Sequence, residues 1–379
     1  MKNKIFLALP AILTAAPILL LTFNCSIQQP EDIIPEKIDF ERTLTSQGQY
    51  FYSMDYNQNY YFDEFIAQGG GKSDQEVKDF LSEKMFDGNK IPTINEPFGC
   101  ASFNFSDYSN KDYHARNFDM FHDINCAAVL KTYPKNGYKS ITNVDFNYFG
   151  EYGYDEITEE FNDPLLDTQY QWWKAAPYFS LDGINEKGLA ISINQLPITE
   201  QSVNQNNPNK SCDLTTSTML RYVLDYCNSV DSAIELLRNI NPHDSLGIRF
   251  HYQISDASGK SVVVEYNDQI NDELIILYPQ DIKSDNNKFI VNENFALYKT
   301  NWSEVDWNSE SPTKAKRFNK AYKTLLENNA TMTVEQGFNL LFDVKQVTTN
   351  WSIVLGLDDL TMSIRYYYKE GVYNKTYYI

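Results

Sequence analysis

The chain lacks several features that mark common classes of protein. It has five cysteines in 379 residues and no Cys-x-x-Cys pair, which excludes common zinc and thioredoxin-like motifs. Its four histidines are scattered, so the sequence predicts no histidine-based metal centre. Positive charge is also scarce. The chain has 32 Lys and Arg against 51 Asp and Glu, and its basic residues form no cluster. Nucleic acid is therefore not an expected partner.

The amino terminus has the pattern of an export signal. Two lysines within the first four residues precede the uncharged run Ile5–Phe23, which predicts a signal peptide over residues 1–24. An uncleaved membrane anchor is the alternative, although two prolines interrupt the run. Cys25 follows at the position of a lipoprotein acceptor, but the residues before it are not small. We therefore expect an extracytoplasmic protein and leave lipid anchoring at Cys25 open.

The remaining chain divides into a polar amino-terminal part and a larger folded part. Residues 26–60 are rich in Gln, Asn and Tyr, and residues 25–99 as a whole are predicted to be a tether and propeptide. Ser73–Phe86 is the exception, since Ser73 and Glu76 have the spacing of a capping box at the start of a helix. A catalytic domain is expected over residues 100–379.

From Gly99 onward, short alternating segments indicate strands, and four longer segments indicate helices. The order of these segments, with helices in mid-chain and near the carboxyl terminus, predicts an α+β fold in layers. The predicted strands are Cys100–Phe105, Asp112–Phe118, Ala127–Thr132, Ser140–Phe149, Gly188–Asn194, Phe250–Ser255, Ser261–Tyr266, Glu273–Tyr278, Lys288–Val291, Trp351–Leu357 and Met362–Tyr368, and the predicted helices are Thr215–Asn228, Ser229–Asn239, Pro312–Glu327 and Thr333–Val344.

One cysteine stands close to charged residues that could make it reactive. Cys100 opens a predicted strand, Arg116 lies sixteen residues later, and Asp119 follows after three more. If the two strands form a hairpin, a guanidinium and a carboxylate approach the thiol, and the cation would favour the thiolate. The same spacing also fits a half-buried cysteine beside an ordinary ion pair.

The segment that carries these residues resembles the nucleophile segment of the choloylglycine hydrolase family. The run GCASFNFSDYSNKDYHARNFD combines a cysteine with an Arg-Asn-x-Asp motif at the family's spacing. Further family motifs follow in order, and they extend the resemblance over residues 100–318. They are DGINEKGL at Asp182–Leu189, ISDASGKSVVVE at Ile254–Glu265, IVN at Ile290–Asn292 and PTKAKRF at Pro312–Phe318.

The resemblance implies a fold and a chemistry. The fold would be the four-layer αββα sandwich of the N-terminal nucleophile (Ntn) hydrolases, two antiparallel sheets flanked by helices. The activity would be hydrolysis of a linear N-acyl amide, such as a bile salt, penicillin V or an N-acyl amine, without metal or cofactor. In this family the mature chain begins at the cysteine, whose α-amine is the base. Because Gly99 blocks that amine here, self-cleavage of the Gly99–Cys100 bond is expected.

The resemblance also assigns the site residues. Cys100 would be the nucleophile, Arg116 would stabilise the thiolate, Asp119 would orient the amine, and Arg317 would complete the polar network. Asn292 would donate to the oxyanion. The second oxyanion donor falls on Gln195, with Asn194 as the alternative, because strand side chains alternate between faces.

Two other functions and the association state stay open. An acyltransferase of this family would pass the acyl group to an amine instead of water. A silent surface lipoprotein would use the fold for binding alone, although it would not need this set of charged residues. The resemblance allows a homo-oligomer.

Overall fold

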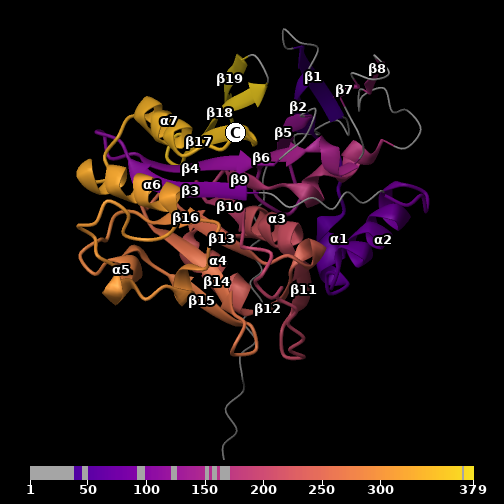
Figure 1. The fold of residues 1–379 in the computed structure, drawn as a ribbon. Helices are drawn as coiled ribbons and strands as arrows, with labels where there is room; N and C mark the ends of the chain where they lie inside the picture. Colours follow the sequence, from indigo (N-terminus) through magenta and orange to yellow (C-terminus); the bar gives the residue numbers. More distant parts are fainter. Residues whose placement is uncertain are drawn as a thin grey trace, which may run out of the picture. The chain divides into compact units, whose positions relative to one another are not determined.

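The computed structural model describes residues 38–44, 50–91, 99–120, 126–149, 153–155, 160–162, 171–368 and 371–379. All of them belong to one compact unit, Glu36–Ile379 (Figure 1). The predicted signal peptide and Cys25 lie outside the described residues. None of the described helices is long and apolar enough to cross a membrane.

Two large sheets form the centre of this unit. The six-stranded sheet carries the predicted cysteine hairpin; its order is β16 (Val291–Glu293), β3 (Gly99–Ser106), β4 (Asp112–Asp119), β17 (Thr349–Gly356), β18 (Thr361–Tyr368) and β19 (Gly371–Tyr378). The nine-stranded sheet has the order β1 (Ile38–Leu44), β2 (Tyr50–Tyr56), β5 (Ala127–Thr132), β6 (Ser140–Asp145), β9 (Asp182–Asn185), β10 (Ala190–Gln195), β13 (Phe250–Ser255), β14 (Ser261–Asn267) and β15 (Glu273–Leu277).

Helices cover the outer faces of both sheets, which confirms the predicted αββα layers. α6 (Lys316–Glu327) and α7 (Val334–Asp343) pack on β3, β4, β16 and β17, and α3 (Thr216–Tyr226) packs on β9 and β10 (Figure 1). Strands β3 and β10 face each other between the sheets. The other described elements are α1 (Phe62–Ala67), α2 (Asp74–Met85), α4 (Val230–Arg238), α5 (Pro279–Ile282), the small pairs β7 (Gly153–Asp155) with β8 (Glu160–Asn162) and β11 (Cys212–Thr215) with β12 (Ile240–His243), and the 3-10 turns Phe146–Phe149, Trp172–Phe179, Ser245–Gly247, Leu297–Lys299 and Trp302–Glu304.

Three predicted elements have different bounds, and in the two strands the cause is a side chain that accepts a hydrogen bond from a backbone N–H. The strand predicted to reach Phe149 ends at Asp145, whose carboxylate accepts from the Asn147 N–H and starts a turn. β16 begins at Val291, later than predicted, because Asn104 Oδ1 accepts from the Ile290 N–H. The helix predicted from Pro312 begins at Lys316, which puts Arg317 in its first turn. The N-cap predicted at Ser73 is confirmed.

The expected propeptide is part of the fold. β2 pairs in parallel with β5, an exception to the antiparallel pairing predicted for both sheets. Residues 50–60 are therefore not a tether, because their aromatic side chains supply core contacts that composition alone did not indicate. The position 99/100 is not a folding boundary in this structure, whereas cleavage there concerns a covalent bond and stays a prediction.

Candidate active site

The hairpin of β3 and β4 determines which residues surround Cys100. Gly99 pairs with Asp119, and Ser102 pairs with Arg116. Opposite residues of antiparallel strands share a face, so Cys100 and Arg116 point toward the nine-stranded sheet while Asp119 points toward the helices. The predicted hairpin is thus confirmed, and it places the thiol and the carboxylate on opposite faces of the strand.

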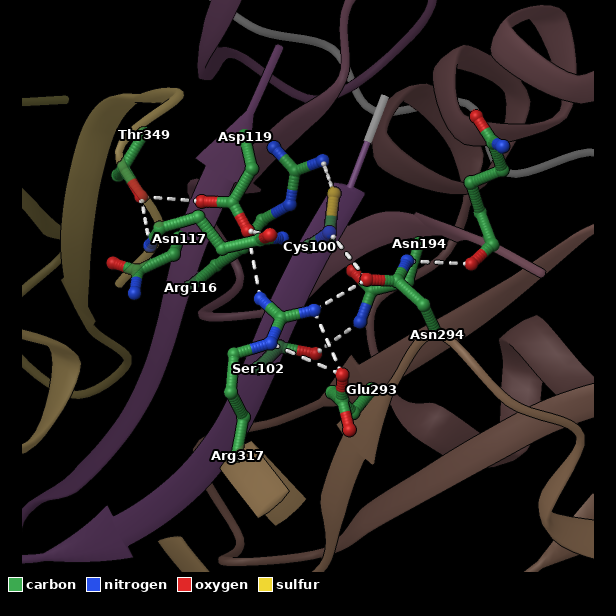
Figure 2. Close-up of polar contacts among 12 residues, drawn as sticks. Cys100, Ser102, Arg116, Asn117, Asp119, Asn194, Glu293, Asn294, Arg317 and Thr349 are labelled. Atoms are coloured by element: carbon green, nitrogen blue, oxygen red, sulfur yellow. Dashed lines mark hydrogen bonds and ion pairs between the residues drawn. The ribbon is translucent and has the colours of Figure 1, made fainter. Parts of the chain in front are cut away.

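The Cys100 sulfur lies in a buried, charged environment between the sheets. The side chains of Cys100 and Arg116 are fully buried. Arg116 Nη2 donates to Cys100 Sγ at 2.9 Å (Figure 2). The same nitrogen donates to the Ile193 carbonyl at 2.6 Å. Burial raises the pKa of the Cys100 thiol to about 11, and the Arg116 charge offsets only part of that rise. Burial therefore favours the neutral form of the thiol in the uncut chain.

Asp182 holds the Arg116 guanidinium in place. Its carboxylate accepts from Arg116 Nη1, and the ion pair is fully buried on both sides. Trp351 Nε1 donates to the same carboxylate at 3.0 Å, and Asn143 Nδ2 donates at 2.5 Å. Asp182 opens the Asp-Gly-x-Asn-Glu-Lys-Gly-Leu motif, but only the pairing of β9 beside β10 shows that it reaches Arg116.

A second polar group surrounds the Cys100 backbone nitrogen. The Cys100 N–H donates to Asn294 Oδ1 at 3.0 Å, and Arg317 Nη2 donates to the same oxygen at 2.6 Å (Figure 2). Arg317 also donates to Asp119 Oδ2 at 2.7 Å and to Glu293 Oε1 at 2.7 Å. One guanidinium therefore links Asp119 to the amide nitrogen that cleavage would turn into an amine.

Asp119 is fixed from three directions. Besides Arg317, Thr349 Oγ1 donates to its Oδ1 at 2.5 Å and Gln346 Nε2 donates to its Oδ2 at 3.0 Å. A Cβ built on Gly99 would lie 2.9 Å from Gln346 Nε2 and 3.3 Å from the Asp119 Cβ. A glycine at position 99 therefore lets this carboxylate and its partners pack directly against the bond expected to be cut.

Two of the predicted oxyanion donors, Asn292 and Asn194, lie beside Ser102, which is two residues along β3 from Cys100. Asn292 pairs with Ser102, is fully buried, and has no hydrogen-bond partner in the described residues for either side-chain polar atom. Asn194 Nδ2 donates to Ser102 Oγ at 3.0 Å, and its Oδ1 has no such partner. Gln195 contributes its backbone carbonyl, which accepts from Asn294 Nδ2 at 2.6 Å.

The predicted residues Cys100, Arg116, Asp119 and Arg317 therefore come together, and Asn294 joins them. Sequence reasoning missed Asn294 because the motif ended at Asn292. Asn294 follows β16, which ends at Glu293, so strand alternation does not predict its direction, and only the structure shows that its side chain meets the Cys100 N–H. In the part of the chain that the structure describes, no group of three or more His, Cys, Asp or Glu side chains could hold a metal ion.

Comparison with known proteins identifies the family. The model of the linear amide C–N hydrolases, choloylglycine hydrolase family, matches residues 100–325. The chain belongs to this family. It is accordingly a hydrolase that acts on carbon–nitrogen bonds in linear amides, and the family acts on small-molecule amides such as bile acids. No curated protein sequence matches the chain.

The solved structures that match the chain are distant in sequence. A variant of the conjugated bile acid hydrolase from Clostridium perfringens shares 16% identity, with 73% of this chain and 92% of that chain covered and a TM-score of 0.46. Penicillin V acylase from Agrobacterium tumefaciens shares 18% identity, with 73% and 85% covered and a TM-score of 0.48.

Proposed function

We propose that this hydrolase is an exported amidase whose nucleophile is Cys100, freed as the amino-terminal residue by cleavage after Gly99. The observation that carries the proposal is the pair of contacts on the two sides of one residue. Arg116 Nη2 lies 2.9 Å from the sulfur, and Asn294 Oδ1 accepts from the backbone N–H at 3.0 Å. These contacts support the proposal because they hold the sulfur and the backbone nitrogen that cleavage would turn into the amine.

Cleavage would use the sulfur against its own chain. Cys100 Sγ attacks the Gly99 carbonyl carbon, the Gly99–Cys100 C–N bond breaks, and the Cys100 nitrogen takes the proton lost by the thiol. Water then hydrolyses the Gly99 thioester, which yields a Gly99 carboxylate and restores the Cys100 thiol beside the amine freed in the first step. Asn294 Oδ1 accepts from this nitrogen, and Arg317 fixes that oxygen by donating to it. Asp119 would stabilise the nitrogen when it becomes an ammonium.

Turnover of substrate would repeat the same steps with an external amide. The Cys100 amine, whose unperturbed pKa is near 7.7–8.0, takes the thiol proton and returns it to the leaving amine. Water hydrolyses the acyl thioester. Arg116 stabilises the thiolate, and the amides of Asn292 and of Gln195 or Asn194 are the proposed oxyanion donors, each worth about 3–4 kcal/mol of transition-state stabilisation.

The proposed substrate is a linear N-acyl amide of small size. The similar proteins are named for conjugated bile acids and penicillin V, so glycine and taurine bile salts and penicillin V form the first test panel. N-acyl ethanolamines and acyl-homoserine lactones extend it to simple chains. An amine acceptor added to the assay distinguishes hydrolysis from acyl transfer.

Trapping the acyl-enzyme tests the nucleophile. The processed protein is mixed with substrate, quenched in acid within one turnover and digested for mass spectrometry. We expect the mass of the acyl group on the peptide that begins at Cys100, and none in a Cys100→Ala protein. A Cys126→Ala protein, which loses another buried thiol, should keep the adduct. An acyl adduct on a different residue would contradict the assignment.

Export is a separate part of the proposal and has its own test. We propose that residues 1–24 direct the chain out of the cytoplasm and that Cys25 can carry a lipid. Cell fractionation and intact mass of the native protein check both: deletion of residues 2–24 should retain the chain in the cytoplasm, and Cys25→Ala should abolish any lipid mass. Retention of the wild-type chain in the cytoplasm would contradict export.

A further inference from the structure

Cleavage after Gly99 would separate a segment that forms part of the sheet. β2 lies between β1 and β5, and its pairing with β5 runs from Phe51 opposite Ala127 to Tyr56 opposite Thr132. The side chains of Tyr52 and Tyr56 are fully buried. Without β2, strand β5 would become an exposed sheet edge with unpaired backbone groups, which folded proteins avoid.

The helices α1 and α2 of the same segment contribute to an aromatic core that also contains residues after Cys100. The Phe62 and Phe65 rings of α1 lie 5.4 Å and 5.6 Å from the Tyr178 ring, and Phe65 is fully buried. The Phe86 ring, just after α2, lies 4.9 Å from the ring of Trp172. These ring pairs are edge-on, one of the geometries that aromatic pairs prefer, and each joins residues on the two sides of the Gly99–Cys100 bond.

Buried polar contacts fix the segment in one position. The Tyr60 hydroxyl donates to Asp225 Oδ2 at 2.7 Å, and the Tyr178 hydroxyl donates to the Tyr60 carbonyl at 2.9 Å. The Gly71 N–H donates to the Asp213 carbonyl at 2.8 Å. Gly70 has φ +76°, and a Cβ built there would lie 1.9 Å from the Asp213 carbonyl oxygen, so only glycine permits this approach.

From these contacts we infer that the mature enzyme is a two-chain protein, in which the segment 50–91 stays bound as a non-covalent subunit after the Gly99–Cys100 bond is cut. The inference rests on the proposed cleavage. The partner of the Cys100–Ile379 chain is thus its own amino-terminal piece. The joint between them is a domain core with one strand, two helices and buried aromatic side chains, the character of an obligate interface. The expected propeptide is then retained and not discarded.

The first experiment follows the native protein. The full chain with a carboxyl-terminal tag is purified after processing, washed in high salt and passed through gel filtration. We expect one amino-terminal fragment per tagged chain, because apolar contacts resist salt, and release of the fragment only in denaturant. A folded, active tagged chain that elutes alone would overturn the inference.

A second experiment separates this inference from the cleavage mechanism. In a Cys100→Ala chain, a protease recognition sequence replaces residues 92–98 and is cut after purification. We expect the fragment to remain bound at one per tagged chain whether or not the wild-type protein cuts itself. Absence of self-cleavage in the wild type would refute the proposed function alone, whereas loss of the fragment from the cut Cys100→Ala protein would refute the retained subunit.

Variants in this cut protein locate the interface. Phe65→Ala should weaken retention of the fragment by about a hundredfold or more, because a fully buried ring is removed from the joint. Gln68→Ala, an exposed position beside α1, should leave retention unchanged. Equal retention in both variants would refute the placement of the interface at α1. Since the chains fold before they are cut, gel filtration of the uncut variants confirms that each is native.

Discussion

Replacing Asp182 by asparagine tests the electrostatic arrangement that holds the site together. The change keeps the size of the side chain and removes its charge. Arg116 then remains fully buried without its counter-ion, while one amide oxygen can still accept from Trp351 Nε1 or Asn143 Nδ2. We expect both a less stable fold and a guanidinium that no longer points steadily at the Cys100 sulfur.

The size of the effect follows from burial. Removing one partner of a buried ion pair costs about 3–5 kcal/mol of the free energy of unfolding, because an uncompensated charge stays in the interior. A retained neutral hydrogen bond is worth about 1 kcal/mol, which places the expected loss near the lower end, about 3 kcal/mol. That value is an increase of about a hundredfold in the unfolding equilibrium constant.

The assay is urea unfolding in a Cys100→Ala background, which prevents the proposed self-cleavage and keeps one covalent species. Circular dichroism and tryptophan fluorescence should give coincident curves. The matched control is Asp231→Asn, which removes the 2.7 Å pair with Lys260, whose side chains are 71% and 37% exposed. That loss should be at most about 1 kcal/mol. Equal losses in the two variants would refute the account of Asp182.

Three further predictions concern the residues around Asp182 and Cys100. A lysine at position 317 cannot reproduce the forked contacts of Arg317 to Asp119, Glu293 and Asn294, so Arg317→Lys should lower kcat/KM of the processed enzyme by about 10²-fold. The control Arg365→Lys, at an ion pair with Glu335 away from the site, should leave kcat/KM unchanged. Equal kcat/KM in the two variants would contradict the role of Arg317. Burial, with a smaller effect of Arg116, lowers the pKa of His114 to about 3. Between pH 6.5 and 3 the unfolded chain therefore binds one more proton than the native state, and the free energy of unfolding falls by about 1.4 kcal/mol for each pH unit of acidification. His114→Gln should flatten the acid limb of the unfolding curve by that slope, and an unchanged limb would refute the pKa. Gly99→Ala should slow cleavage by displacing Gln346 from Asp119, and Gln346→Ala in the same chain should restore part of the rate; no slowing would show that the close packing is unimportant.

The elements with strong local signals were predictable, and the ones that depend on distant partners were not. The hairpin of Cys100–Phe105 with Asp112–Phe118 and the helix capped by Ser73 follow from alternation and capping, which act within a few residues. β2 carries no such local signal, because the contacts that bury its side chains come from far along the chain, as with the Phe51 ring against those of Tyr366 and Tyr373. The polar composition of residues 26–60 therefore indicated a tether where the structure has a strand.

The same distinction applies to the site. Cys100, Arg116 and Asp119 lie in one hairpin, so their proximity could be predicted from spacing and resemblance. Asp182 and Asn294 reach the site through pairing between strands far apart in sequence, and that register is set by the packing of whole sheets. Which of the side chains of Asn194 and Gln195 points toward the site likewise depends on how β10 twists and packs against the other sheet. The structure directs Asn194 toward Ser102, while the role of oxyanion donor stays a prediction for both.

The central claim is that activity requires a chain that begins at Cys100. The direct measurement is intact mass spectrometry of the purified exported protein during maturation, with the rate of acyl-amide hydrolysis recorded on the same samples. The account predicts a chain whose mass begins at Cys100 and a rate that rises in proportion to the cleaved fraction. Full activity with the Gly99–Cys100 bond intact would contradict it.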